Sequence, residues 1–203
     1  MYDRLPGLIL GYHGCDRRVG EAVLSGKTEL QSSNNSYDWL GHGIYFWEHN
    51  PTRAVEWARL NQQRPNANRK KVRDPMAIGA VIDLGLCLNL LDARFLAQLP
   101  LAYEELRAFH LELGQPLPVN RTLGKSKDLL LRHLDCAVIE TLHQLRAEDA
   151  KPSFDTARGV FVEGEPLYPG AAIQKFNHIQ LCVRNPGCIK GYFRLREKLQ
   201  IID

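Results

Sequence analysis

The sequence has no apolar run that approaches the ~18 residues with which a helix crosses a bilayer. Its first six residues, Met1–Pro6, also lack the basic-then-apolar layout of a secretory signal. These two absences argue against a membrane span and against export through a cleaved signal. We therefore expect a soluble, cytoplasmic protein with no membrane partner.

The sequence also lacks any Cys-x-x-Cys pair, and its five cysteines are odd in number and widely spread. This pattern is typical of reduced thiols and not of a disulfide framework or a zinc site. Glu140 and His143, with His133 before them, lie on a predicted helix whose apolar stripe favours a core helix over a metal site. We expect no metal.

Charge and repetition are limited as well: the formal net charge is +3, and no internal repeat is visible. Such a mild charge does not by itself indicate a nucleic-acid or membrane surface. With 203 residues, of which 44% are hydrophobic, the chain can bury one sizeable core. We expect a single domain over residues 1–203.

Two short apolar strands with glycines at their ends stand out in the first quarter of the chain. The first strand, from Leu8, is closed by Tyr12-His13-Gly14, and Gly14 has no side chain that would block the approach of a ligand to its backbone. The second is Ile44-Tyr45-Phe46 after Gly41 and Gly43, with a polar loop before it at 31–36. Asn50 as N-cap and Pro51 as first helical residue then predict a helix over 50–58.

The rest of the chain alternates helices and strands. Apolar periodicity and capping residues predict helices at 16–24, 93–99, 101–113 and 127–146, and Asp92 is the expected cap of the second of these. Strands are predicted within 76–91 and at 158–164 and 175–183. We expect the segment 76–91 to form one or two central strands.

Three features resemble the ADP-ribosyltransferase superfamily, in its poly-ADP-ribose-polymerase-like branch, and bacterial single-domain relatives. They are, in order, Tyr12-His13-Gly14, Gly43-Ile44-Tyr45-Phe46 and a following helix with Ala54. This resemblance implies an α+β fold with a split mixed β-sheet, surrounding helices and an NAD cleft. By the same resemblance, His13 and Gly14 hold the nicotinamide ribose and carboxamide of NAD, and Tyr45 stacks on the nicotinamide ring.

Three neighbours of these residues join the expected NAD contacts: Cys15 after the first motif, Gly43 before the second, and Trp57 as a wall beside the nicotinamide, although core packing is the stronger interpretation of Trp57. NAD is thus expected as a substrate.

The C-terminal strand departs from the family pattern. The family usually has a glutamate there, and the best match in this sequence is Gln180, which forms hydrogen bonds but carries no negative charge. Glu163, at the end of the preceding strand, is the first candidate to replace that acid, and Glu48 is a weaker one. His178, two residues before Gln180, lies on the same face of the strand and is expected to position the acceptor.

A basic segment at 64–73 contains Arg64, Arg69, Lys70, Lys71 and Arg73 without an aromatic residue. A solvated loop is the simpler interpretation, and a phosphate-contacting strip for a nucleic-acid acceptor is the alternative.

The function that the resemblance implies is transfer of one ADP-ribose from NAD to a protein or nucleic-acid acceptor, with release of nicotinamide. By analogy with small transferases, the chain would be a bacterial toxin of a toxin–antitoxin or antiphage system, with an antitoxin protein as partner. Two alternatives stay open: an NAD glycohydrolase that uses water as the acceptor, and a catalytically inactive module that binds NAD or ADP-ribose.

Overall fold

The protein is described here by a computed structural model, which covers residues 7–63, 72–124 and 127–196. The strands are β1 (Leu8–Asp16), β2 (Ile44–Glu48), β3 (Pro75–Asp83), β4 (Cys87–Asn89), β5 (Thr156–Phe161), β6 (His178–Val183) and β7 (Ile189–Arg194). The helices are α1 (Arg17–Leu24), α2 (Pro51–Gln63), α3 (Ala93–Leu96), α4 (Leu99–Glu112) and α5 (His133–Glu148), with a 3-10 turn η1 (Pro186–Cys188).

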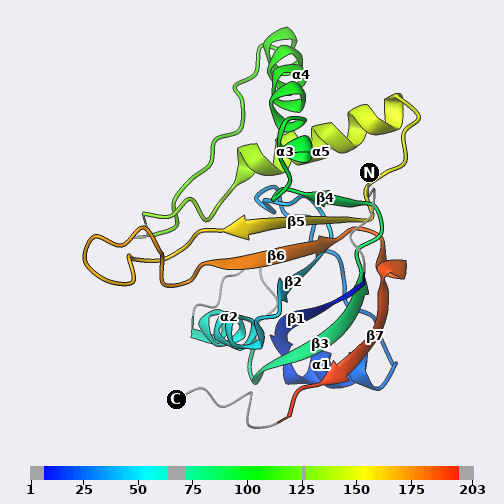
Figure 1. Cartoon of the computed structure of the whole chain (residues 1–203), viewed down its shortest axis with the longest axis vertical. Helices are drawn as coiled ribbons and strands as arrows, with labels where there is room; N and C mark the ends of the chain where they lie inside the picture. Colours follow the sequence, from blue (N-terminus) through cyan, green and yellow to red (C-terminus); the bar gives the residue numbers. More distant parts are fainter. Residues whose placement is uncertain (1–6, 64–71, 125–126, 197–203) are drawn as a thin grey trace.

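The seven strands form one mixed sheet in the order β4-β5-β6-β2-β1-β3-β7 (Figure 1). Only β4 and β5 run parallel; the other neighbouring strands are antiparallel. Helices and a mixed sheet in one body confirm the α+β class predicted from the sequence. Among the described helices, none is long and apolar enough to pass through a membrane.

The backbone ladders on the two sides of β1 differ in length. The register of β1 with β3 extends from Leu8 opposite Asp83 to Asp16 opposite Pro75, whereas β1 and β2 pair only at Gly11–Glu48 and Tyr12–Trp47. The backbone ladder between β1 and β2 is therefore much shorter than the ladder on the other side of β1.

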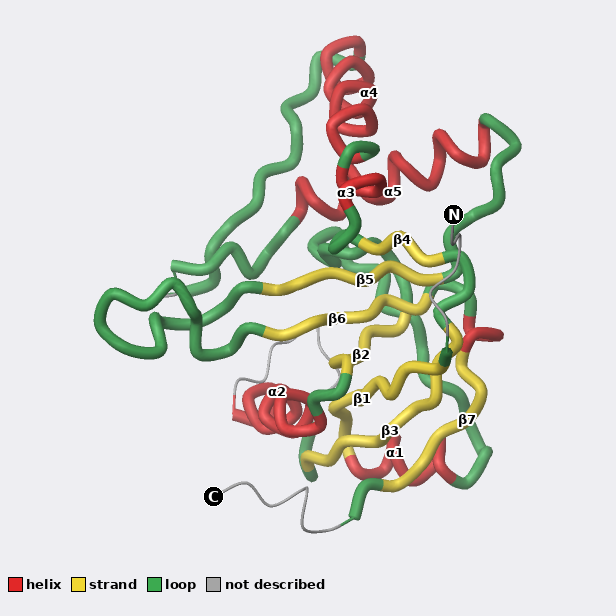
Figure 2. The backbone as a smooth tube through the Cα atoms, viewed as in Figure 1, coloured by secondary structure: helices red, strands yellow, loops and turns green. Residues whose placement is uncertain are grey.

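The helices pack against different strands of the sheet. In Figure 1, α3, α4 and α5 lie beside β4, and α2 lies at the ends of β1 and β3. The long β5–β6 connection projects past the ends of those strands, as the tube in Figure 2 shows. Three groups of buried side chains result: one around Phe46 and Ile78, one between α4, α5 and the strands β4–β6, and one between α2 and β1–β3.

The predicted capping residues of α2 and α3 are confirmed. α2 begins at Pro51, and the side chain of Asn50 accepts a hydrogen bond from the backbone N–H of Arg53 at 3.1 Å. Asp92 likewise accepts from the backbone N–H of Arg94 at the start of α3. These short-range contacts need only the residues that form them, which is why the sequence predicts them.

Several predicted boundaries were wrong. β1 does not close at 12–14 but continues to Asp16, because every one of its residues pairs with β3. The strands within 76–91 are not central: β4 is an edge strand, and β3 has only β7 outside it. α5 starts at His133 and not near 127, because the Asn120 side chain accepts from the Leu134 backbone N–H at 2.9 Å.

The basic segment is mostly outside the described residues, which include Arg73 but not Arg64, Arg69, Lys70 or Lys71. The backbone N–H of Arg73 donates to a carboxylate oxygen of Asp16 at 2.7 Å, so this end of the segment is held against the end of β1.

Candidate functional site

His13 links the two strands that carry the sequence motifs. Its Nδ1 lies 2.8 Å from the carbonyl oxygen of Tyr45, just beyond Tyr12 and Trp47, the last backbone pair of β1 and β2. A carbonyl oxygen only accepts hydrogen bonds, so we assign the ring hydrogen to Nδ1 and the lone pair to Nε2. Burial lowers the pKa of His13 below 6.5, which keeps the ring neutral at pH 7.

The rings of His13 and Tyr45 pack against different groups of buried side chains. His13 packs edge-on against Phe46, with ring centroids 5.7 Å apart, and Phe46 belongs to the first core group. Tyr45 precedes Phe46 on β2 and packs against the second group, which lies between α4, α5 and the strands β4–β6. The structure thus brings the two predicted residues together through the Tyr45 backbone and not through their side chains.

Gly14 is a packing requirement as well as a predicted ligand contact. A Cβ on Gly14 would lie 2.0 Å from the carbonyl oxygen of Ala54 and 3.3 Å from the Trp57 ring. The absence of a side chain therefore lets the backbone of α2 approach β1 directly. This contact also brings Trp57 against Trp47, with ring centroids 5.6 Å apart.

The phenol hydroxyl of Tyr45 both donates and accepts a hydrogen bond within the protein. Its hydroxyl donates to the carbonyl of Gly41 at 2.8 Å and accepts from the backbone N–H of Leu40 at 3.0 Å. Burial raises its pKa well above the usual value, so it stays protonated. What Tyr45 offers is a rigidly held ring.

Gly43 and Cys15 are also explained by packing. A Cβ on Gly43 would lie 2.6 Å from both the Cys182 sulfur and the Val183 carbonyl oxygen. Cys15 is buried, and burial raises the pKa of its thiol to about 12, so it is a neutral core residue and not a nucleophile.

Gln180 has a side-chain partner that the sequence did not predict. Nε1 of Trp39 donates to Oε1 of Gln180 at 2.6 Å. Trp39 fits there because Gly159, opposite Gln180 in the β5–β6 ladder, leaves room: a Cβ on Gly159 would lie 2.6 Å from the Trp39 ring. The Gln180 carboxamide is thereby held in one orientation on the face of β6 that also carries His178.

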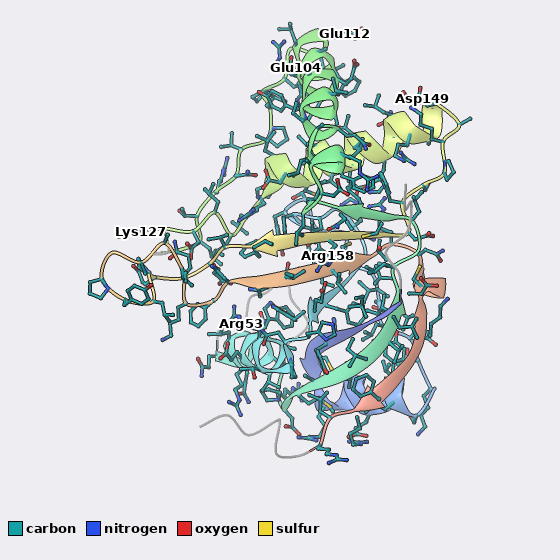
Figure 3. The ribbon with its side chains drawn as sticks, in the orientation of Figure 1. Arg53, Glu104, Glu112, Lys127, Asp149 and Arg158 are labelled. Carbon is teal, nitrogen blue, oxygen red and sulfur yellow. The ribbon has the colours of Figure 1, made fainter. Side chains whose placement is uncertain are left out.

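Glu163 lies two residues beyond β5 and turns towards α2. One of its oxygens accepts from Nη2 of Arg53 at 3.0 Å, while Nη1 of Arg53 bonds Glu56 at 2.7 Å. Figure 3 shows Arg53 on α2. Burial raises the pKa of Glu163 above its usual value, and Arg53 opposes that shift. The carboxyl group therefore has one cationic partner and an increased affinity for a proton.

Glu48, the weaker candidate acid, is engaged in a buried ion pair. Nε and Nη2 of Arg158 donate to its two oxygens at 2.6 and 2.7 Å, and the two side chains are only 8% and 15% exposed. A carboxylate held by both oxygens in this fork has a structural role in joining β2 to β5.

The α5 residues considered for a metal site, Glu140 and His143, contact other groups of the protein. The described part of the chain holds no group of three or more metal-ligating side chains. Glu140 instead bonds Arg184 and the backbone N–H of His42, the latter at 2.8 Å. His143 is buried edge-on against Phe154.

Together these contacts define an α+β protein whose candidate site lies where β1, β2, β6 and the start of α2 meet. Sequence reasoning did not identify Trp39 or Arg53; their only signals are an aromatic residue in a polar loop and an arginine in the first turn of a helix. Comparisons of the chain with protein-family models, curated proteins and solved structures gave no match. The function is therefore inferred from the residues and their geometry.

Proposed function

We propose that the protein is an NAD-dependent mono-ADP-ribosyltransferase with an ADP-ribosyltransferase-like fold. The hydrogen bond from His13 to the Tyr45 carbonyl is the observation on which this proposal rests, because it joins the two motif strands next to β6, which carries Gln180. The short β1–β2 ladder agrees with a split sheet.

In the proposed reaction the bond between the nicotinamide nitrogen and C1′ of the ribose breaks, and nicotinamide leaves with the bonding electrons. A nucleophile of a protein or nucleic-acid acceptor then bonds C1′ and loses its proton. Positive charge develops on the ribose, so a negative group near it would lower the barrier. Neutral His13 would orient the ribose, and Tyr45 would support the nicotinamide ring.

Glu163 suits the removal of the nucleophile's proton. Its raised pKa increases its affinity for a proton, which is what a general base needs. It also lies in the connection from β5 to β6, most of whose residues are exposed, so that an acceptor would reach it. Gln180 would hydrogen-bond a ribose hydroxyl through its amide.

One observation favours a second candidate, a catalytically inactive module that binds NAD or ADP-ribose. Gln180 is neutral, and its oxygen is already occupied by the indole N–H of Trp39. An NAD glycohydrolase differs from the transferase only in using water as the acceptor. A role as a toxin with an antitoxin partner stays a prediction by analogy.

The test is nicotinamide release from NAD by the purified protein, with and without cell lysate. We expect release that needs lysate and that falls at least 10²-fold in His13→Ala. Glu163→Gln and Gln180→Ala then show which side chain carries the acid's role. The exposed-residue variant His49→Asn is the control, since Asn tolerates the left-handed φ of 49° at that position. NAD binding without release would instead establish the binding module, and neither binding nor release would overturn both candidates.

A further inference from the structure

The connection between β5 and β6, residues 162–177, has backbone hydrogen bonds of its own. The backbone N–H of Phe176 donates to the carbonyl oxygen of Glu163 at 3.0 Å, beyond the last pair of the β5–β6 ladder. Further out, the backbone N–H of Leu167 donates to the carbonyl oxygen of Ile173 at 2.9 Å. The two halves of the connection are therefore held to each other and not only at the strand ends.

Arg53 contacts both ends of this connection from the first turn of α2. Its Nη2 donates to a carboxylate oxygen of Glu163 at 3.0 Å, and its guanidinium lies over the Phe176 ring, 4.5 Å from the ring centroid. Its Nη1 donates to Glu56, three positions later on α2, at 2.7 Å. Because the guanidinium is planar, these contacts together fix its orientation. One side chain thus joins the start and the end of the connection to the same helix.

Gly164 lets the backbone of the connection approach the Phe176 ring. A Cβ on Gly164 would lie 2.8 Å from that ring, so a side chain there would have to displace it. The backbone N–H of Gly164 also donates to a carboxylate oxygen of Asp128 at 3.0 Å. The residue next to Glu163 is therefore held from the segment before α5 as well as by the packing around Phe176.

The Glu163 carboxyl group has charges of both signs near it. Arg53 and Glu56 act on it from α2, and Asp128 acts on it from the segment before α5. Burial raises the pKa of Glu163, Arg53 opposes this rise, and the two acidic neighbours add to it. The Arg53 side chain is 10% exposed and the Glu163 side chain is 23% exposed. The cation is therefore largely buried, whereas the carboxyl group stays accessible.

We propose that Arg53 is a positioning residue, which holds both ends of the β5–β6 connection on α2 and so fixes the Glu163 carboxyl group beside the candidate site. This role rests on the proposed function, because Glu163 is the group that would take the proton of the acceptor. Proton transfer needs the base within hydrogen-bond reach of the nucleophile. A carboxyl group on a connection without this contact would sample many positions, and few of them would be productive.

Hydrogen exchange of the backbone N–H groups in residues 164–176, followed by mass spectrometry, tests how firmly the connection is held. Arg53→Lys keeps the positive charge, but an ammonium lacks the planar fork that reaches two carboxylates. We expect exchange in this segment to be about 10-fold faster or more in Arg53→Lys, with no change in β3. The control is Arg107→Lys, which changes an exposed arginine that is likewise paired with a glutamate three positions away.

The pH dependence of lysate-dependent nicotinamide release is a readout that a purely structural role of Arg53 would not move. The unprotonated form of Glu163 is the active one, so the rate falls as the pH drops through its pKa. Arg53→Met removes the charge that opposes protonation, and it should shift this acid limb to higher pH by roughly one unit. Asp128→Asn removes a negative charge but keeps an acceptor for the Gly164 N–H, and it should shift the limb to lower pH.

A double variant shows whether Arg53 acts through Glu163. Arg53→Lys should slow the lysate-dependent reaction about 10-fold in the otherwise wild-type chain. In the Glu163→Gln background the acid limb should be absent, and Arg53→Lys should slow the reaction no further, because the group that it positions is already lost.

The outcomes separate this role from the proposed function. If exchange and the acid limb are unchanged in folded Arg53 variants of an active enzyme, Arg53 does not position Glu163, and the proposed function stands. If exchange becomes faster but the acid limb stays in place, Arg53 only strengthens the fold, and the positioning role is wrong. If the wild type releases no nicotinamide with lysate, the proposed function fails, and the positioning role fails with it.

Discussion

Nδ1 of His13 lies 2.8 Å from the carbonyl oxygen of Tyr45, and this side chain continues the connection between β1 and β2 beyond their last backbone pair. A side-chain link differs from a ladder bond because it leaves the second ring nitrogen for another partner. Nδ1 of His178 also lies beside a carbonyl oxygen, here that of Phe176 two positions earlier in the chain. Two neutral histidines with an acceptor nitrogen each therefore lie on β1 and β6, the two strands on either side of β2.

Gln180→Glu should increase nicotinamide release if Gln180 occupies the position of the missing acid. A carboxylate there would keep the hydrogen bond from Trp39 Nε1 and add the negative charge that the developing ribose cation needs. We expect an increase on the order of 10²-fold, measured as initial rate at saturating NAD. An unchanged rate in a folded variant would mean that another group supplies the charge.

Gly14→Ala should destabilise the fold strongly. The added Cβ would lie 2.0 Å from the Ala54 carbonyl oxygen, a backbone atom of α2 that moves only with its helix. We expect a loss of about 3 kcal/mol in the free energy of unfolding, measured by urea denaturation. Gly191→Ala is the matched control in β7, because a Cβ there has no atom within 4 Å. Equal stability of the two variants would contradict the close contact of α2 with β1.

The ion pair of Glu48 and Arg158 should be structural. Glu48→Leu leaves the largely buried Arg158 guanidinium without its forked partner, and we expect it to cost about 3–5 kcal/mol of folding free energy. The double variant with Arg158→Met should cost clearly less, since neither charge is then left alone. A double-mutant cycle by chemical denaturation measures this difference. Additive effects would show that the two side chains do not interact.

Stability should fall in mild acid because of buried histidines. The pKa of His143 is lowered from 6.5 to about 4, mainly by burial, so between these values the unfolded chain binds more protons than the folded one. Stability contributed by the neutral ring is therefore present above pH 6.5 and is lost as the pH falls towards 4, by about 3 kcal/mol for this one group.

Denaturation midpoints of the wild type and His143→Gln at several pH values measure that contribution. The variant should lose less stability than the wild type between pH 7 and pH 4. His49→Asn removes an exposed histidine and is the control for the loss of an imidazole from the surface. A pH dependence that is identical in all three proteins would contradict the assigned shift.

Several features of this protein follow from the sequence alone because their causes are local. The caps at Asn50 and Asp92 involve residues two or three positions away, so composition and spacing predict them. The apolar strands around His13 and Tyr45 also contain the residues predicted for them, although β1 continues to Asp16, because short apolar runs next to glycines mark strands in the sequence.

Only the tertiary structure decided how those residues meet. Gly14 faces α2 because of a backbone contact with Ala54, and Gln180 is held by Trp39 from 141 positions away. No local pattern contains such pairings, since they depend on which strands become neighbours in the sheet. The sequence by itself determined the elements and the α+β class; strand order and long-range packing decided which side chains share a site.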